Sequence, residues 1–101
     1  MDDTVKTVVR TITEAIRPVK VFLFGSRAEG NAKEDSDIDL LILYAGPKSP
    51  RDVQVHIHRL FPRPGFSLDV FVLTPEDFER QKGVANTLAR EVSERGILCH
   101  G

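Results

Sequence analysis

Residues 24–40 read FGSRAEGNAKEDSDIDL, and this stretch decides the fold. Gly25 and Ser26 directly follow a short apolar run, and after ten intervening residues Asp37 and Asp39 open a second apolar run. Glycine lets a backbone approach a ligand closely, and serine is a preferred N-cap of a helix. Backbone N–H groups at a helix N-terminus favour phosphate, so a strand, a Gly-Ser pair and a helical turn can hold a triphosphate. The alternative is an ordinary strand-to-helix turn capped by Ser26, and the Gly-Ser pair alone favours that alternative.

The paired aspartates indicate a site for divalent cations. Side chains alternate along a strand, so Asp37 and Asp39 are expected on one face, about 7 Å apart along the strand. Mg²⁺ takes hard oxygen ligands, and the two ions of a phosphoryl-transfer site sit roughly 3.5–4 Å apart. A third acid, Asp69, interrupts the apolar run at residues 66–73. We expect Asp69 beside Asp39 on the neighbouring strand; the alternative is an edge strand with Asp69 facing water.

Outward from this stretch, the sequence predicts helices and strands in the order α-β-turn-β-α-β-α-α-β. Residues 27–36 form the turn and a loop, and the almost wholly apolar run at residues 38–43 is expected to be buried on both faces. Residues 53–61 have helical spacing, although Val53, Val55 and Ile57 also alternate as in a strand. The other predicted elements are helices near residues 5–16 and 84–92, a short helix that begins at residues 74–77, and strands at residues 19–24, 66–73 and 97–99. We therefore expect an α/β (α+β) domain, with a small mixed β-sheet and helices packed mainly on one face.

Composition favours one ordinary globular domain over residues 1–101, with 41% hydrophobic and 29% charged residues. Fourteen basic residues face fifteen acidic ones, so generic binding of nucleic acid by phosphate neutralisation is disfavoured, and sequence-specific binding is not expected. The single cysteine, Cys99, excludes an internal disulfide and a multi-cysteine zinc site. The acidic start, MDDT, does not resemble a signal peptide, and no apolar run has membrane-spanning length. The expected location is the cytoplasm, without a membrane partner.

The functional residues resemble the signature of the nucleotidyltransferase superfamily that includes DNA polymerase β. That signature is Gly-Ser, a gap of about ten residues, Asp-x-Asp and a later acid, and Gly25-Ser26, Asp37-Ile38-Asp39 and Asp69 fit it. Within the superfamily, nearly the whole chain is similar to the minimal nucleotidyltransferases, or MNT domains. The resemblance implies the palm-like sheet of polymerase β. It also implies pairing with a HEPN-domain protein as a toxin–antitoxin system, in which some MNT proteins transfer AMP from ATP to the toxin.

The resemblance also implies roles for the three acids. Asp37 and Asp39 would hold Mg²⁺ in a two-metal site. Asp69 would complete that metal site and help to deprotonate the acceptor hydroxyl. Attack of the acceptor on the α-phosphorus of ATP would then release pyrophosphate.

In the same resemblance, Gly25 and Ser26 would hold the β- and γ-phosphates of the nucleotide. Arg27, next to this turn, would add positive charge, or would be an ordinary surface arginine. Glu29 stands where many relatives carry a second basic residue, and this departure puts a strongly basic triphosphate clamp in doubt.

Three functions are compatible with this pattern. The first is an adenylyltransferase that modifies a hydroxyl of a toxin protein, which either completes the small site or is itself the substrate. The second is an antitoxin that neutralises its partner by occlusion and keeps an inert nucleotide site. An antibiotic nucleotidyltransferase is a distant third, because such enzymes usually add a second domain. A second copy of the chain is a further candidate partner, through the short C-terminal strand.

Overall fold

The computed structural model describes residues 2–30, 37–62 and 65–101. Its elements follow the predicted order, and they are α1 (Asp3–Ile16), β1 (Lys20–Phe24), β2 (Ile38–Leu43), α2 (Pro50–Arg59), β3 (Leu68–Leu73), α3 (Pro75–Gln81), α4 (Leu88–Arg95) and β4 (Ile97–His100). The helix predicted from the spacing of residues 53–61 is confirmed by α2, and the alternative prediction of a strand there is wrong. In the described parts of the chain, no helix has both the length and the apolar character to cross a membrane.

Each helix begins at a polar residue whose side chain accepts a hydrogen bond from a backbone N–H three positions later. These N-cap residues are Asp2, Ser49, Thr74 and Thr87. The caps satisfy backbone donors that have no partner inside a helix, which fixes where each helix starts. At its other end, α1 stops at Ile16 because Arg17 adopts a left-handed conformation with φ 53° and Pro18 follows.

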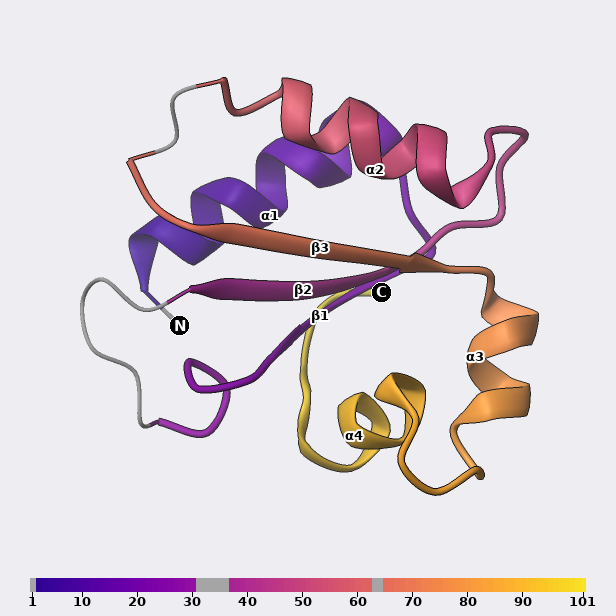
Figure 1. Ribbon diagram of the computed structural model, residues 1–101. Helices are drawn as coiled ribbons and strands as arrows, with labels where there is room; N and C mark the ends of the chain where they lie inside the picture. Colours follow the sequence, from indigo (N-terminus) through magenta and orange to yellow (C-terminus); the bar gives the residue numbers. More distant parts are fainter. Residues whose placement is uncertain (1, 31–36, 63–64) are drawn as a thin grey trace.

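The four strands form one mixed sheet in the order β3-β2-β1-β4. β1 is antiparallel to both β2 and β4, whereas β2 and β3 are parallel. The parallel pair requires a crossover connection, which α2 provides. The two longest strands, β2 and β3, therefore begin at the same end of the sheet. The Gly-Ser turn after β1 also lies at this end (Figure 1).

The side chains of β2 alternate between two hydrophobic clusters, one on each face of the sheet. Ile38, Leu40 and Ile42 belong to the larger cluster, which packs under α1 and α2. Leu41 and Leu43 belong to the smaller one, with residues of α3 and α4. We expected helices mainly on one face; the two longer helices do lie together there, and the two short ones lie across the sheet (Figure 1). This second cover follows from β2, which is apolar on both faces.

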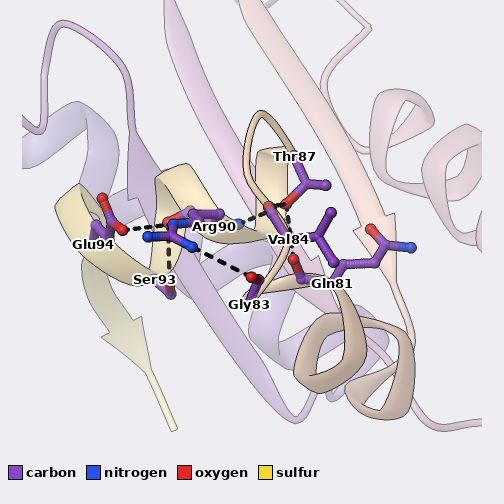
Figure 2. A network of polar contacts seen from close by, with 7 residues as sticks. All are labelled: Gln81, Gly83, Val84, Thr87, Arg90, Ser93 and Glu94. Carbon is purple, nitrogen blue, oxygen red and sulfur yellow. Dashed lines mark hydrogen bonds and ion pairs between the residues drawn. The ribbon is translucent and has the colours of Figure 1, made fainter.

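A polar network holds the connection between α3 and α4 in place (Figure 2). The Thr87 hydroxyl lies 2.9 Å from the carbonyl oxygens of both Gln81 and Val84. Arg90 donates to the Glu94 carboxylate at 2.8 Å and to the Gly83 carbonyl at 3.3 Å. The two short helices are thereby fixed to each other as a unit over the second face of the sheet.

Candidate active site

The acids that the sequence singled out meet at one end of the sheet. Asp39 is the register partner of Asp69 on β3 and of Phe24 on β1. Partners in register project to the same face, so both carboxylates stand side by side on the face that carries the smaller cluster. The prediction that Asp69 lies beside Asp39 is confirmed. Asp69 is also exposed to solvent, as the alternative prediction of an edge strand required. Asp39, by contrast, is half-buried.

The surroundings of Asp39 disfavour a negative charge on its carboxyl group. Burial, which is the largest cause, raises the pKa of Asp39 from its usual 3.8 to about 6. The charge of Asp69 and a hydrogen bond with that side chain raise the pKa further, and the charges of Asp37 and Glu91 add to the effect. Four acidic side chains thus gather within electrostatic range, and below a pH of about 6 the protonated carboxyl of Asp39 donates a hydrogen bond to Asp69.

Asp37 is exposed and directly precedes β2 rather than opening it. Its effect on the pKa of Asp39 places it in the same acidic group. Among the residues with described positions, no three His, Cys, Asp or Glu side chains are already grouped as metal ligands. The donor chemistry nevertheless fits a hard cation, because the oxygens of Asp39 and Asp69 are in contact and repel each other when both are ionised. A divalent cation would relieve that repulsion.

The backbone of Gly25 lies close to the carboxylate of Asp39. Its φ is 76°, a left-handed conformation, and a Cβ atom at this position would overlap the Asp39 carboxylate. Any other residue would therefore be strained in its backbone and would displace the acid. The backbone N–H groups of Ala28 and Glu29 donate to the Gly25 carbonyl at 3.1 and 3.2 Å. These bonds confirm the predicted helical turn.

Ser26 is exposed at the start of this turn, next to the acids. The loop predicted after the turn falls on residues 31–36, which lie outside the described residues. Gly25 and Ser26 are separated from Asp39 along the chain but lie close to it in the fold, because the backbone of Gly25 contacts Asp39, the second aspartate of the pair.

Two ion pairs hold the turn between α1 and α4. The Arg27 guanidinium, nine-tenths buried, pairs with Asp2 at the N-terminus of α1. Glu29 pairs with Arg95 of α4 at 3.7 Å. Arg27 therefore helps to position the turn, which the sequence did not indicate; a contact between Arg27 and phosphate stays a prediction. Glu29, which departs from the family pattern, has a structural contact of its own.

A second surface, on the outer side of α2, differs in charge from the acidic group. A shallow hollow of about 640 Å³ is lined there by Arg51, Gln54, Val55, His58, Arg59 and Pro62. On the same helix, His56 accepts a hydrogen bond from the Lys48 ammonium at 3.0 Å. Arg51 lies about two helical turns before His58 and Arg59, and this spacing on α2 could have revealed the basic face.

The family model described as "Nucleotidyltransferase domain" matches residues 3–99. A crystal structure of a toxin–antitoxin with AMP-PNP superposes with a TM-score of 0.66 at 18% identity, covering 95% of this chain and 73% of that one. A candidate nucleotidyltransferase from Sulfolobus solfataricus superposes with a TM-score of 0.62 at 24% identity, covering 94% and 75%. At these identities the two structures show the shared fold, and no curated protein matches the sequence.

Proposed function

This chain belongs to the nucleotidyltransferase domain family, and we propose that it transfers AMP from ATP to a hydroxyl group of a toxin protein. The observation that carries the proposal is the contact between Asp39 and Asp69, in register on parallel strands, with Gly25 packed against the Asp39 carboxylate. Nucleotidyl transfer needs a turn that binds phosphate and a pair of carboxylates beside it, and both would lie at this end of the sheet.

Each residue of the site has a role in this proposal. Asp37, Asp39 and Asp69 would hold Mg²⁺, which when bound offsets the negative charge of the acids and of the nucleotide phosphates. The backbone at Gly25 and Ser26 would bind the β- and γ-phosphates through N–H groups at the start of the turn. Arg27 would add positive charge from beneath the turn, where Asp2 holds it.

The chemical step is a displacement at the α-phosphorus. The acceptor oxygen forms a bond to this phosphorus, and the bond between the phosphorus and the oxygen that bridges to the β-phosphate breaks. Asp69 is exposed and would take the proton of the acceptor hydroxyl. Pyrophosphate leaves with the electrons of the broken bond, and the acceptor carries AMP.

The acceptor is proposed to be a protein because the acidic site is open. Asp37 and Asp69 are both exposed, although α4 comes within electrostatic range of Asp39 through Glu91. Exclusion of water and positioning of the acceptor supply much of an enzyme's rate, so a partner that covers the acids would complete the site. A toxin–antitoxin complex with AMP-PNP shares this fold, which supports a toxin as that partner. A HEPN-domain toxin is the partner that the sequence resemblance implies.

The test combines α-labelled ATP, Mg²⁺ and a lysate of the source cells with wild type or with an Asp37→Asn/Asp39→Asn double variant. A labelled protein band is expected with wild type only, and its mass identifies the acceptor. Pyrophosphate release in equal amount would confirm the bond that breaks. The proposal is contradicted if the partner, once isolated by pull-down, is silenced equally by both proteins without label, because occlusion then explains the antitoxin effect.

A further inference from the structure

Phe71 is a large apolar side chain that lies exposed beside the acidic group. It follows Asp69 by two residues on β3, so both side chains project from the same face of the sheet. Its register partner on β2 is Leu41, which is fully buried, yet 43% of the surface of Phe71 is exposed. An exposed phenylalanine on the face of a strand that should be covered calls for a physical explanation.

The ring of Phe71 is held from one side and open on the other. It packs against Phe24, with ring centroids 5.8 Å apart and an angle of 55° between the ring planes. Phe24 itself is buried and directly precedes Gly25, so the aromatic contact joins the base of the phosphate turn to β3. Farther along the same face, Phe22 stacks on Phe78 of α3, which closes that end of the sheet.

The cover that α3 and α4 provide leaves Phe71 partly exposed, because β3 is an edge strand of the sheet. The buried cluster beneath the two short helices includes Leu41, the register partner of Phe71, and Phe24, the register partner of Asp39. Phe71 therefore lies at the border of this cluster, two residues along β3 from the carboxylate of Asp69. A fixed aromatic ring that borders a charged site and keeps a free surface is suited to stack with a planar ligand group.

We propose that Phe71 is the platform on which the base of the donor nucleotide stacks. This inference rests on the proposed function, since it assumes that the α-phosphate lies at Asp39 and Asp69. Residues two apart on one strand face are separated by about 7 Å. A ribose ring with its exocyclic carbon spans a similar gap between phosphate and base, so a nucleotide with its α-phosphate at Asp69 brings its base over Phe71.

Stacking on Phe71 would recognise the area of the base rather than its hydrogen-bonding edge. Every base has a flat face, and stacking on an aromatic side chain tolerates changes of sequence. The larger ring systems of ATP and GTP are therefore expected to bind similarly, and both more tightly than CTP and UTP. The Gly-Ser turn, which would bind the phosphates, does not distinguish one base from another.

The experiment compares Kd values of wild type and Phe71→Leu for ATP and for inorganic tripolyphosphate, both with Mg²⁺. Leucine keeps an apolar side chain and removes the ring. We expect Phe71→Leu to weaken ATP binding about tenfold, leave tripolyphosphate binding unchanged and narrow the difference between purine and pyrimidine nucleotides. Phe66→Leu is the matched control, because Phe66 packs against Phe61 and the cluster on the opposite face. This control is expected to leave both Kd values unchanged.

Phe71→Trp is the second variant, and its larger ring is expected to preserve or tighten ATP binding, which keeps the test decisive if the leucine variant unfolds. Unchanged ATP affinity in Phe71→Leu, or an equal loss for ATP and tripolyphosphate, would overturn the platform while leaving the proposed function intact. If Phe71→Leu affects only the KM for the protein acceptor, the ring stacks with the acceptor instead, and the inference is wrong. Failure of wild type to bind either phosphate ligand would overturn the proposed function as well.

Discussion

β2 presents apolar side chains on both of its faces, but the two faces are covered by helices to different extents. On one face, Ile38, Leu40 and Ile42 are completely buried under α1 and α2 along the whole strand. On the other face, Leu41 and Leu43 are buried under α3 and α4, but the position at the start of this row is Asp39. The fully covered face builds the fold, and the uncovered end of the other face gathers the acids. The incomplete cover that α3 and α4 give this face thus leaves space for a site.

The comparison also explains why the acids stay close together in spite of their repulsion. The parallel ladder between β2 and β3 holds Asp39 opposite Asp69, and the same ladder is fixed on its far side by buried side chains such as Leu40 and Val70. The core therefore forces an electrostatic arrangement that the acids alone would avoid. Such local conflicts with the rules of folding are expected at functional sites.

The largest effect is expected from Asp39→Asn, which removes one charge from the acidic group and keeps the shape of the side chain. Loss of this carboxylate is expected to lower AMP transfer about a thousandfold, comparable to removing a principal charge-stabilising group from an active site. Initial rates of label transfer measure this change. Asp52→Asn, at an exposed acid on α2, is the matched control and should retain the wild-type rate. Equal rates for wild type and Asp39→Asn would mean that the acids are not the site.

Alanine substitutions at two neighbouring leucines of β2 compare the two covers directly. Leu40→Ala opens a cavity in the larger cluster and is expected to lower the free energy of unfolding by about 4 kcal/mol. Leu41→Ala opens one beneath the short helices, which can move inward, so the expected loss is about 2–3 kcal/mol. Denaturant unfolding monitored by circular dichroism measures both values. A larger loss at Leu41 would show that the second cover is the more rigid one.

Gly25→Ala tests the close approach between the turn and the acid. The left-handed backbone conformation of Gly25 costs an alanine about 1–2 kcal/mol, and its Cβ would push against Asp39. We expect a loss of stability of this size together with a fall in transfer rate, because the carboxylate moves. Gly30→Ala is the control: its φ is also 76°, but a Cβ there would meet nothing within 4 Å. Gly30→Ala should lose similar stability and keep its activity, so equal losses of activity in both variants would contradict the role of the contact.

The smallest effect concerns the pH dependence of stability without metal. The pKa of Asp39 is raised to about 6 in the folded state, so the folded protein holds a proton that the unfolded chain releases near pH 3.8. Between these values the folded state binds more protons, and stability falls as the pH rises toward 6. Asp39→Asn removes this dependence and should be more stable than wild type at pH 7.5, with a smaller advantage at pH 5. Urea unfolding at the two pH values in EDTA measures it, and an advantage that grows at pH 5 would reverse the sign.

How much the sequence could predict differs between these parts of the molecule. The almost wholly apolar run at residues 38–43 and the helical spacing of residues 53–61 are local signals, and they indicated a strand and a helix where β2 and α2 are found. The pairing of Asp39 with Asp69 was also predictable, because each acid breaks an apolar run at one position. The role of each acid in the reaction stays a prediction.

What the sequence could not predict depends on contacts between distant elements. The ion pair of Arg27 with Asp2 joins residues 25 positions apart, and nothing local in either residue indicates it. The exposure of Phe71 likewise depends on how far α3 and α4 reach over the sheet, because in the sequence Phe71 has the pattern of a core residue. The pattern of side-chain types along a strand predicts the face on which a residue lies. Whether that face is exposed to solvent depends on how far the helices extend over it.

The most direct test of the central claim, that the uncovered acidic end binds the nucleotide, is an NMR titration of the backbone amides with ATP and Mg²⁺. Our account predicts shifts that cluster at Gly25 and Ser26, at Asp39 and at Asp69, with little change on α2. It also predicts that these shifts disappear in the Asp37→Asn/Asp39→Asn variant. Shifts centred on the basic hollow of α2, at Arg51, His58 and Arg59, and unchanged in that variant, would contradict the account and place nucleotide binding on the opposite face of the sheet.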